Sequence, residues 1–87
     1  YSAPINLIKL VILPLMTAKE KEQQRFGAHL RKLREAKGIS LHGLAALSGL
    51  EYGQLQKTET GQVNPTLYTI IRIAHGLDIA PSELLNY

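Results

Sequence analysis

Helix-breaking residues divide most of this chain into short segments, and this division limits what the chain can fold into. Gly38, Gly49 and Gly61 each end a segment of helical periodicity, and the pair Asn64-Pro65 blocks a helix before the fourth segment. Nothing in these segments has the pattern of a strand. From residue 17 onward, the sequence therefore predicts a small all-α domain built from short helices.

Capping residues and apolar spacings predict five helices, over about residues 17–37, 41–48, 52–59, 67–76 and 81–87. Thr17 and Ser40 are the expected N-caps of the first two helices, and Pro81 falls in the first turn of the last. The positions expected to be buried are Phe26, Leu30, Leu33, Leu41, Leu44, Ala45, Leu47, Leu50, Leu55, Leu67, Ile70, Ile71, Ala74 and Leu77.

An apolar run lies between Pro4 and Pro14, before the helical part. Its nine residues are rich in Ile, Leu and Val, which predicts a β-strand. The run carries Lys9 and is too short for a membrane span, which takes about 20 residues. A lone strand leaves its edges unpaired, so we expect it to pair with the same strand of a second copy. The residues of this dimerisation strand are Ile5, Leu7, Ile8, Leu10, Val11, Ile12 and Leu13.

Two other interpretations of the N-terminal run stay open. The main alternative to the dimerisation strand is a tail that lies on the apolar surface of its own domain. The chain does not begin with Met and its only Met is Met16, so residues 1–15 also fit a leftover or processed upstream extension.

Composition and charge narrow the class of protein. The 87-residue chain has no cysteine, which excludes disulfides and thiolate zinc sites and suits a reducing cytoplasm. Seven of its ten basic residues lie in positions 19–37, against three glutamates. Such a cluster is ordinarily a solvated helix face. The net charge of +3 permits binding to nucleic acid but does not by itself require it.

Two short helices joined by a turn that contains Gly49 are typical of a helix-turn-helix. The surrounding motifs are LRKLREAKGIS, LAALSGL and ETGQVNPTLYTIIRIAHGLDIAPSELL. With these motifs, residues 26–86 resemble the Xre/Cro-type phage-repressor helix-turn-helix family along their whole length. The resemblance implies a compact five-helix, lambda-repressor-like DNA-binding domain over residues 17–87, preceded by the apolar arm of residues 1–16.

The second helix of a helix-turn-helix lies in the major groove of DNA, with its N-terminal part near the base edges. The residues there, which we expect to read bases, are Tyr52, Gly53, Gln54, Gln56 and Lys57. Gln bonds adenine through two hydrogen bonds and Lys reaches guanine. Position in the family favours Tyr52, Gly53 and Lys57 as base readers, whereas Gln54 and Gln56 would touch bases or the DNA backbone.

Contacts to DNA phosphates are expected from Ser40, His42, Thr60, Gln62, Asn64, Arg25, Arg31 and Lys32. Leu41 stands where the family often has a phosphate-binding glutamine, so that contact is missing here. In the family an arginine of the first helix also pairs with a glutamate at the end of the reading helix, here Arg34 and Glu59. Because a guanidinium holds a carboxylate in a forked geometry, we expect this pair to be structural.

The sequence predicts no enzyme. His29, His42 and His75 lack the spacing of metal ligands, and the chain has no glycine-rich phosphate loop. We therefore expect no catalytic residue, no metal and no cofactor. The combined prediction is a cytoplasmic, sequence-specific transcriptional regulator that binds a palindromic operator on double-stranded DNA as a homodimer. Repression is the simplest action, because a short chain blocks polymerase by occupying its site.

The alternative is a protein-interaction module on the same fold, of antitoxin or adaptor type. The reading helix region is net acidic, with Glu51 and Glu59 against Lys57. In that case the apolar arm would be the surface that binds a protein partner. A charge reversal at Lys57 separates the two functions, since it would abolish DNA binding and leave a protein-interaction module unaffected.

Overall fold

The computed structural model describes residues 15–87, and the predicted strand with its dimerisation residues lies outside this range. Residues 15–87 contain no strand and fold into five α-helices, which are α2 (Ala18–Ala36), α3 (Leu41–Ser48), α4 (Tyr52–Glu59), α5 (Leu67–Leu77) and α6 (Pro81–Leu84). The predicted all-α domain is therefore confirmed for this part of the chain.

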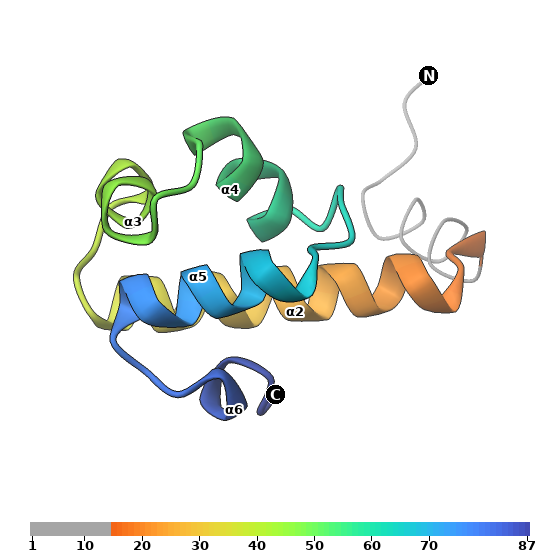
Figure 1. Ribbon diagram of the computed structural model, residues 1–87. Coiled ribbons are helices and arrows are strands. Elements are labelled where there is room, and N and C mark those ends of the chain that lie inside the picture. Colours follow the sequence, from red (N-terminus) through yellow and green to blue (C-terminus); the bar gives the residue numbers. More distant parts are fainter. Residues whose placement is uncertain (1–14) are drawn as a thin grey trace, which may run out of the picture.

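The long helix α2 runs along one side of the domain, and the shorter helices pack around it (Figure 1). α4 packs on α2, α3 packs on both α4 and α5, and α6 joins the end of α5 to α2. α3 and α4 thereby lie along one side of α5, and α6 lies on its opposite side (Figure 1).

Side-chain caps begin the first two helices, as predicted. The Thr17 hydroxyl accepts a hydrogen bond from the backbone N–H of Glu20 at 3.1 Å, and the Ser40 hydroxyl accepts one from that of Gly43 at 2.9 Å. Each bond satisfies an N–H that would have no partner inside the helix. The local sequence thus determines where α2 and α3 start.

The C-terminal ends of the helices agree with the prediction nearly as well as the starts do. Gly38 takes the left-handed conformation, with a φ of +66°, just after α2 ends. α5 extends slightly past the predicted Gly76 and ends at Leu77, where Asp78 forms a left-handed cap with a φ of +54°. Aspartate tolerates this conformation better than most residues other than glycine.

Within residues 15–87, eight buried hydrophobic residues form the core, and every helix from α2 to α6 contributes at least one. They are Phe26, Leu30, Leu44, Leu55, Ile73, Ala74, Leu77 and Leu84. Leu33, Leu41, Ala45, Leu50 and Ile70, which were also expected inside, are half-buried against this cluster.

Three residues expected in the core lie on the surface, so that part of the prediction is wrong. Leu47, Leu67 and Ile71 expose 54%, 73% and 46% of their areas. The buried face of α5 is rotated relative to its most apolar stripe, because α3 packs against Gly76: a Cβ there would lie 3.0 Å from the Leu44 side chain. Contact with a neighbouring helix therefore decides which apolar residues are buried.

Candidate nucleic-acid interface

A tight turn connects α3 to α4. Gly49 takes a left-handed φ of +71°, and its N–H donates to the carbonyl of Ala45 at 3.0 Å. The N–H of Leu50 donates to the same carbonyl at 3.2 Å, and its side chain packs against the core. The turn is thus held by its backbone bonds and by an apolar anchor, which fixes the direction in which α4 leaves α3 (Figure 1).

α4 has one buried side and a broad exposed side. Leu55 and Thr58 are buried, and the hydroxyl of Thr58 donates to a carbonyl of its own helix at 2.8 Å. The exposed side carries all the predicted base readers, which are Tyr52, Gly53, Gln54, Gln56 and Lys57. The helix therefore presents a polar surface to solvent on the side of the molecule formed by α3 and α4.

Gln54 is tied to α5 although it is exposed. Its Nε2 donates a hydrogen bond to the hydroxyl of Thr69 at 3.1 Å, in the first turn of α5. A base contact by Gln54 would have to use the remaining amide atoms or break this bond. This contact was not predicted from the sequence, because the two residues lie on different helices and neither spacing nor residue type points to it.

Tyr52 begins α4, and its ring stacks on the imidazole of His42 in the first turn of α3. The ring centroids lie 4.0 Å apart and the planes differ by 14°. The stack joins the N-terminal ends of the two helices. It brings a predicted base reader together with a predicted phosphate contact, a pairing that neither spacing nor residue type indicates.

Arg34 and Glu59 connect α2 to the C-terminal end of α4. Arg34 donates from Nε to Glu59 Oε2 at 2.6 Å and from Nη2 to Oε1 at 2.9 Å, and a third bond reaches the carbonyl of Ile39 at 2.8 Å. The two side chains are only 13% and 7% exposed. The hydrogen bond to Glu59 raises the pKa of Arg34, because it favours the charged guanidinium. The structure thus joins the two expected partners in a forked ion pair.

This ion pair depends on the close approach of two backbones. A Cβ atom added to Gly27 of α2 would lie 2.4 Å from the carbonyl oxygen of Glu59 and 2.5 Å from that of Thr58. The space exists only because residue 27 has no side chain. Gly27 was not among the residues predicted to matter, although a glycine inside a helical pattern often has such a packing reason.

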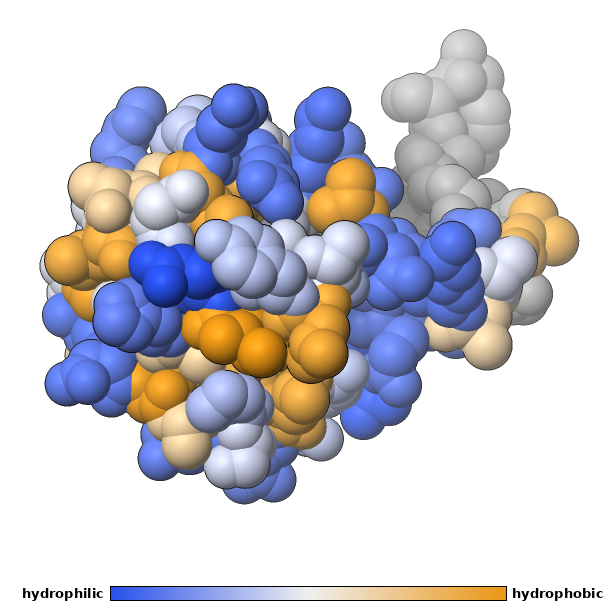
Figure 2. All heavy atoms as spheres, viewed as in Figure 1, coloured by the Kyte–Doolittle hydropathy of each residue, from blue (hydrophilic) through white to orange (hydrophobic). Residues whose placement is uncertain are grey.

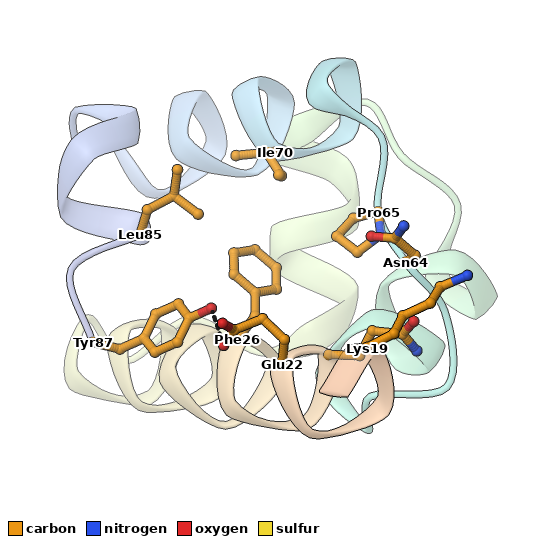
Figure 3. A pocket seen from close by; sticks show the side chains of 9 residues that line it. Lys19, Glu22, Phe26, Asn64, Pro65, Ile70, Leu85 and Tyr87 are labelled. Atoms are coloured by element: carbon orange, nitrogen blue, oxygen red, sulfur yellow. Dashed lines mark hydrogen bonds between the residues drawn. The ribbon is translucent and has the colours of Figure 1, made fainter. Parts of the chain in front are cut away.

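The predicted phosphate contacts fall in several places. Ser40 caps α3, whereas Thr60 and Gln62 form a hydrogen-bonded pair after α4, with Gln62 Nε2 donating to the Thr60 hydroxyl at 2.8 Å. Asn64 lies elsewhere, on the rim of an apolar groove between α2 and α5 (Figure 3).

Arg25, Arg31 and Lys32 of α2 line a shallow depression between that helix and Tyr87. Arg31 pairs with Glu35 at 2.9 Å and lies between this depression and the side of α2 that carries Gly27 and Arg34 and packs on α4. The guanidinium of Arg25 lies 5.3 Å from the centre of the Tyr87 ring. Lys32 lies seven residues after Arg25, on the same side of the helix.

Residues 15–87 contain neither a metal-binding cluster nor a helix that could span a membrane. In this range no group of three or more His, Asp or Glu side chains is arranged to hold a metal ion. None of the helices described here combines the length and the apolar character that a membrane span requires.

The geometry of α3, its turn and α4 defines a helix-turn-helix domain. A sequence profile described as "Helix-turn-helix domain" matches residues 25–86, and the chain belongs to this family, within its Xre-like group. The sequence is 32% identical over 60 residues to an uncharacterised HTH-type transcriptional regulator, y4dJ, of Sinorhizobium fredii (strain NBRC 101917 / NGR234). That alignment covers 69% of this chain and 78% of the relative.

Solved structures give the same result. The fold is similar to the restriction-modification controller protein C.AhdI from Aeromonas hydrophila, with 45% identity and a TM-score of 0.72, covering 74% of this chain and 97% of that one. It is also similar to an HTH_3 family transcriptional regulator from Vibrio cholerae, with 29% identity and a TM-score of 0.74. That match covers 78% of this chain and 38% of the Vibrio protein.

Proposed function

We propose that this protein is a cytoplasmic, sequence-specific DNA-binding transcriptional regulator that acts as a repressor. The observation that carries the proposal is the helix-turn-helix, whose second helix exposes a polar surface while Arg34 and Glu59 fix its position. Regulators of this architecture insert that helix into the major groove. The relatives named above are described as regulators or as a controller, and none is named as an enzyme.

Tyr52, Gly53, Gln56 and Lys57 are the proposed base readers. A Cβ at Gly53 would meet nothing within 4 Å, so the backbone of α4 is open to close approach by DNA at this point. Lys57 and Gln56 carry the donors and acceptors that base edges bind. Gln54 has a secondary role in this proposal, because its amide is already bonded to α5.

Phosphate contacts are proposed for both ends of the motif. Ser40 lies at the start of α3, and Thr60 and Gln62 follow α4. On α2, Arg31 has the most favourable position, since it borders the side that packs on α4. Arg25, Lys32 and Asn64 would make outer contacts with a larger DNA surface.

The regulator is proposed to act as a homodimer on a palindrome with half-sites about 10 base pairs apart. The arm through Ile5–Leu13 is the proposed contact between the two copies. A second surface also fits this role, since Leu67, Tyr68 and Ile71 of α5 are exposed large apolar side chains. Figure 2 shows apolar side chains gathered over α5 with hydrophilic residues around them. Exposed apolar patches of this kind often mark contacts between proteins.

This second surface continues into an apolar groove. Phe26 of α2 points between Ile70 of α5 and Leu85 of the C-terminal segment, and Pro65 borders the opposite side (Figure 3). Either the arm or the α5 surface of a second copy would cover apolar side chains here that now contact water.

A selection experiment tests the proposed function. The full chain and a version without residues 1–15 are incubated with a pool of random duplexes at near-physiological salt, and the retained duplexes are sequenced. We expect an enriched palindrome for the full chain. Loss of the palindrome on truncation identifies the arm as the dimer contact. If the palindrome survives truncation but is lost in Ile71→Lys, the dimer forms through α5.

The alternative function is a protein-interaction module. In the sequence, the acidic residues at the two ends of α4 favour this alternative. Lys57→Glu discriminates between the two functions, since it would remove binding to the enriched duplex. An absence of any enriched duplex for the full chain would contradict the regulator and favour the interaction module.

The similarity to C.AhdI suggests a more specific setting for the regulator. Since 97% of a restriction-modification controller aligns with this chain at 45% identity, control of restriction-modification genes is the preferred role. Binding of the purified protein to the promoter region of such a gene pair in its own genome tests this role.

A further inference from the structure

The stack of His42 on Tyr52 connects the two helices of the motif at the surface, outside the hydrophobic core. Both residues are exposed, and their rings are nearly parallel, with 4.0 Å between centroids and 14° between planes. His42 lies in the first turn of α3 and Tyr52 is the first residue of α4. The stack thus lies at the end of α4 that enters the major groove in a helix-turn-helix.

An exposed tyrosine is free to change its χ1 rotamer on the nanosecond timescale. A second ring against one of its faces disfavours the rotamers that break the contact, which restricts the phenol to one direction. The hydroxyl lies at the edge of the ring, so a neighbour on the ring face leaves it accessible. A group that is already ordered before binding loses less conformational entropy when it binds.

We propose that His42 is a positioning residue for DNA reading. By stacking on Tyr52, it holds the phenol in the rotamer that directs the hydroxyl into the major groove, and it thereby sets the base preference at the position that Tyr52 contacts. This inference rests on the proposed function and deepens it. The simpler role for His42, a direct hydrogen bond to a phosphate, makes different predictions.

The variants His42→Ala, His42→Phe, Tyr52→Ala and the double variant separate these roles, with His75→Ala on α5 as a matched control for loss of an exposed histidine. Binding is measured on the duplex enriched from the random pool and on duplexes with single base-pair changes. Thermal melting of each variant confirms that it folds.

We expect His42→Ala to weaken binding about 2- to 10-fold and to reduce the base preference at one position in each half-site. His42→Phe keeps an aromatic ring and retains affinity within about 2-fold, together with the preference. In the Tyr52→Ala background, His42→Ala has no further effect, because the coupled partner is absent. The control His75→Ala binds like the wild type.

The proposal is overturned if His42→Phe binds as weakly as His42→Ala, or if His42→Ala has its full effect without Tyr52. Either result assigns His42 to a phosphate. Unchanged affinity and unchanged preference in His42→Ala also overturn it.

A measurement without DNA tests the stack of His42 on Tyr52 independently of the proposed function. Ring protons of Tyr52, assigned in the NMR spectrum by their loss in Tyr52→Phe, are expected at higher field in the wild type and in His42→Phe than in His42→Ala. If this shift is present but no duplex is enriched, the proposed function fails and the reading role fails with it. If a duplex is enriched and the shift is absent, the positioning inference alone fails.

Discussion

Gly27 and Gly53 are both helical glycines, but their surroundings differ. At Gly27 a Cβ would lie 2.4 Å from a backbone oxygen of α4, and at Gly53 it would meet no atom within 4 Å. A backbone atom cannot move aside as the end of a flexible side chain does. Gly27 is therefore required by packing, whereas Gly53 lowers the helix propensity of α4 without a packing reason in the free protein.

We predict that Gly27→Ala destabilises the protein by about 1–3 kcal/mol, because α2 and α4 must separate to accept the methyl group. Gly53→Ala is the matched control and stabilises by up to about 1 kcal/mol through helix propensity. Urea denaturation of both variants measures the changes. Equal stabilities of Gly27→Ala and the wild type would show that the helices separate without cost.

Tyr87 gives a pH-dependent prediction. Burial raises its pKa, and the hydrogen bond that its hydroxyl donates to Glu22 at 2.9 Å adds to the effect (Figure 3). Since the folded pKa lies above the unfolded value, the neutral tyrosine favours folding. This contribution is complete below about pH 10 and is lost as the pH rises through the folded pKa.

We expect the stability difference between the wild type and Tyr87→Phe to shrink as the pH rises above about 10, by less than about 1 kcal/mol because Tyr87 is partly exposed. Chemical denaturation of both proteins across this range measures it. Contributions that the two proteins share cancel in the difference. A difference that does not change with pH would contradict the raised pKa.

At the scale of elements, the position of α4 depends on one buried ion pair. We predict that Glu59→Ala costs about 3–5 kcal/mol, because it leaves the Arg34 guanidinium buried without its carboxylate. Glu35→Ala breaks the exposed Arg31–Glu35 pair and should cost at most about 1 kcal/mol. Thermal or urea unfolding measures the stabilities of the two variants. If Glu59→Ala is as stable as the wild type, the Arg34–Glu59 pair has no structural role.

The elements themselves were largely predictable. Thr17 and Ser40 begin helices through bonds to amides three residues away, and Gly38 and Gly49 end them, so the signals lie within one turn of the residues they control. The rotation of α5 about its axis was not predictable. The most apolar stripe includes Leu67 and Ile71, but α3 packs on a different side.

At the scale of the whole molecule, the charge on α2 bears on how the protein binds DNA. The logarithm of affinity should fall linearly with the logarithm of salt, with a slope of about −0.9 for each neutralised phosphate. We predict that Arg31→Gln lowers the magnitude of this slope by about 1 and weakens binding to all duplexes alike. Lys19→Gln is the control, since Lys19 borders the apolar groove. Fluorescence anisotropy titrations at several salt concentrations give both slopes, and equal slopes for the two variants would exclude Arg31 as a phosphate contact.

The sequence by itself determined the helices, the caps at Thr17 and Ser40 and the turn at Gly49, and its motifs indicated the helix-turn-helix family that the comparisons confirm. These features depend on residues close together in the chain. Only the tertiary structure revealed the contact of Gly27 with α4, the bond from Gln54 to α5 and the stack of His42 on Tyr52. Each joins residues on different helices, so it depends on how those helices pack, and no local pattern encodes the distance between two helix surfaces.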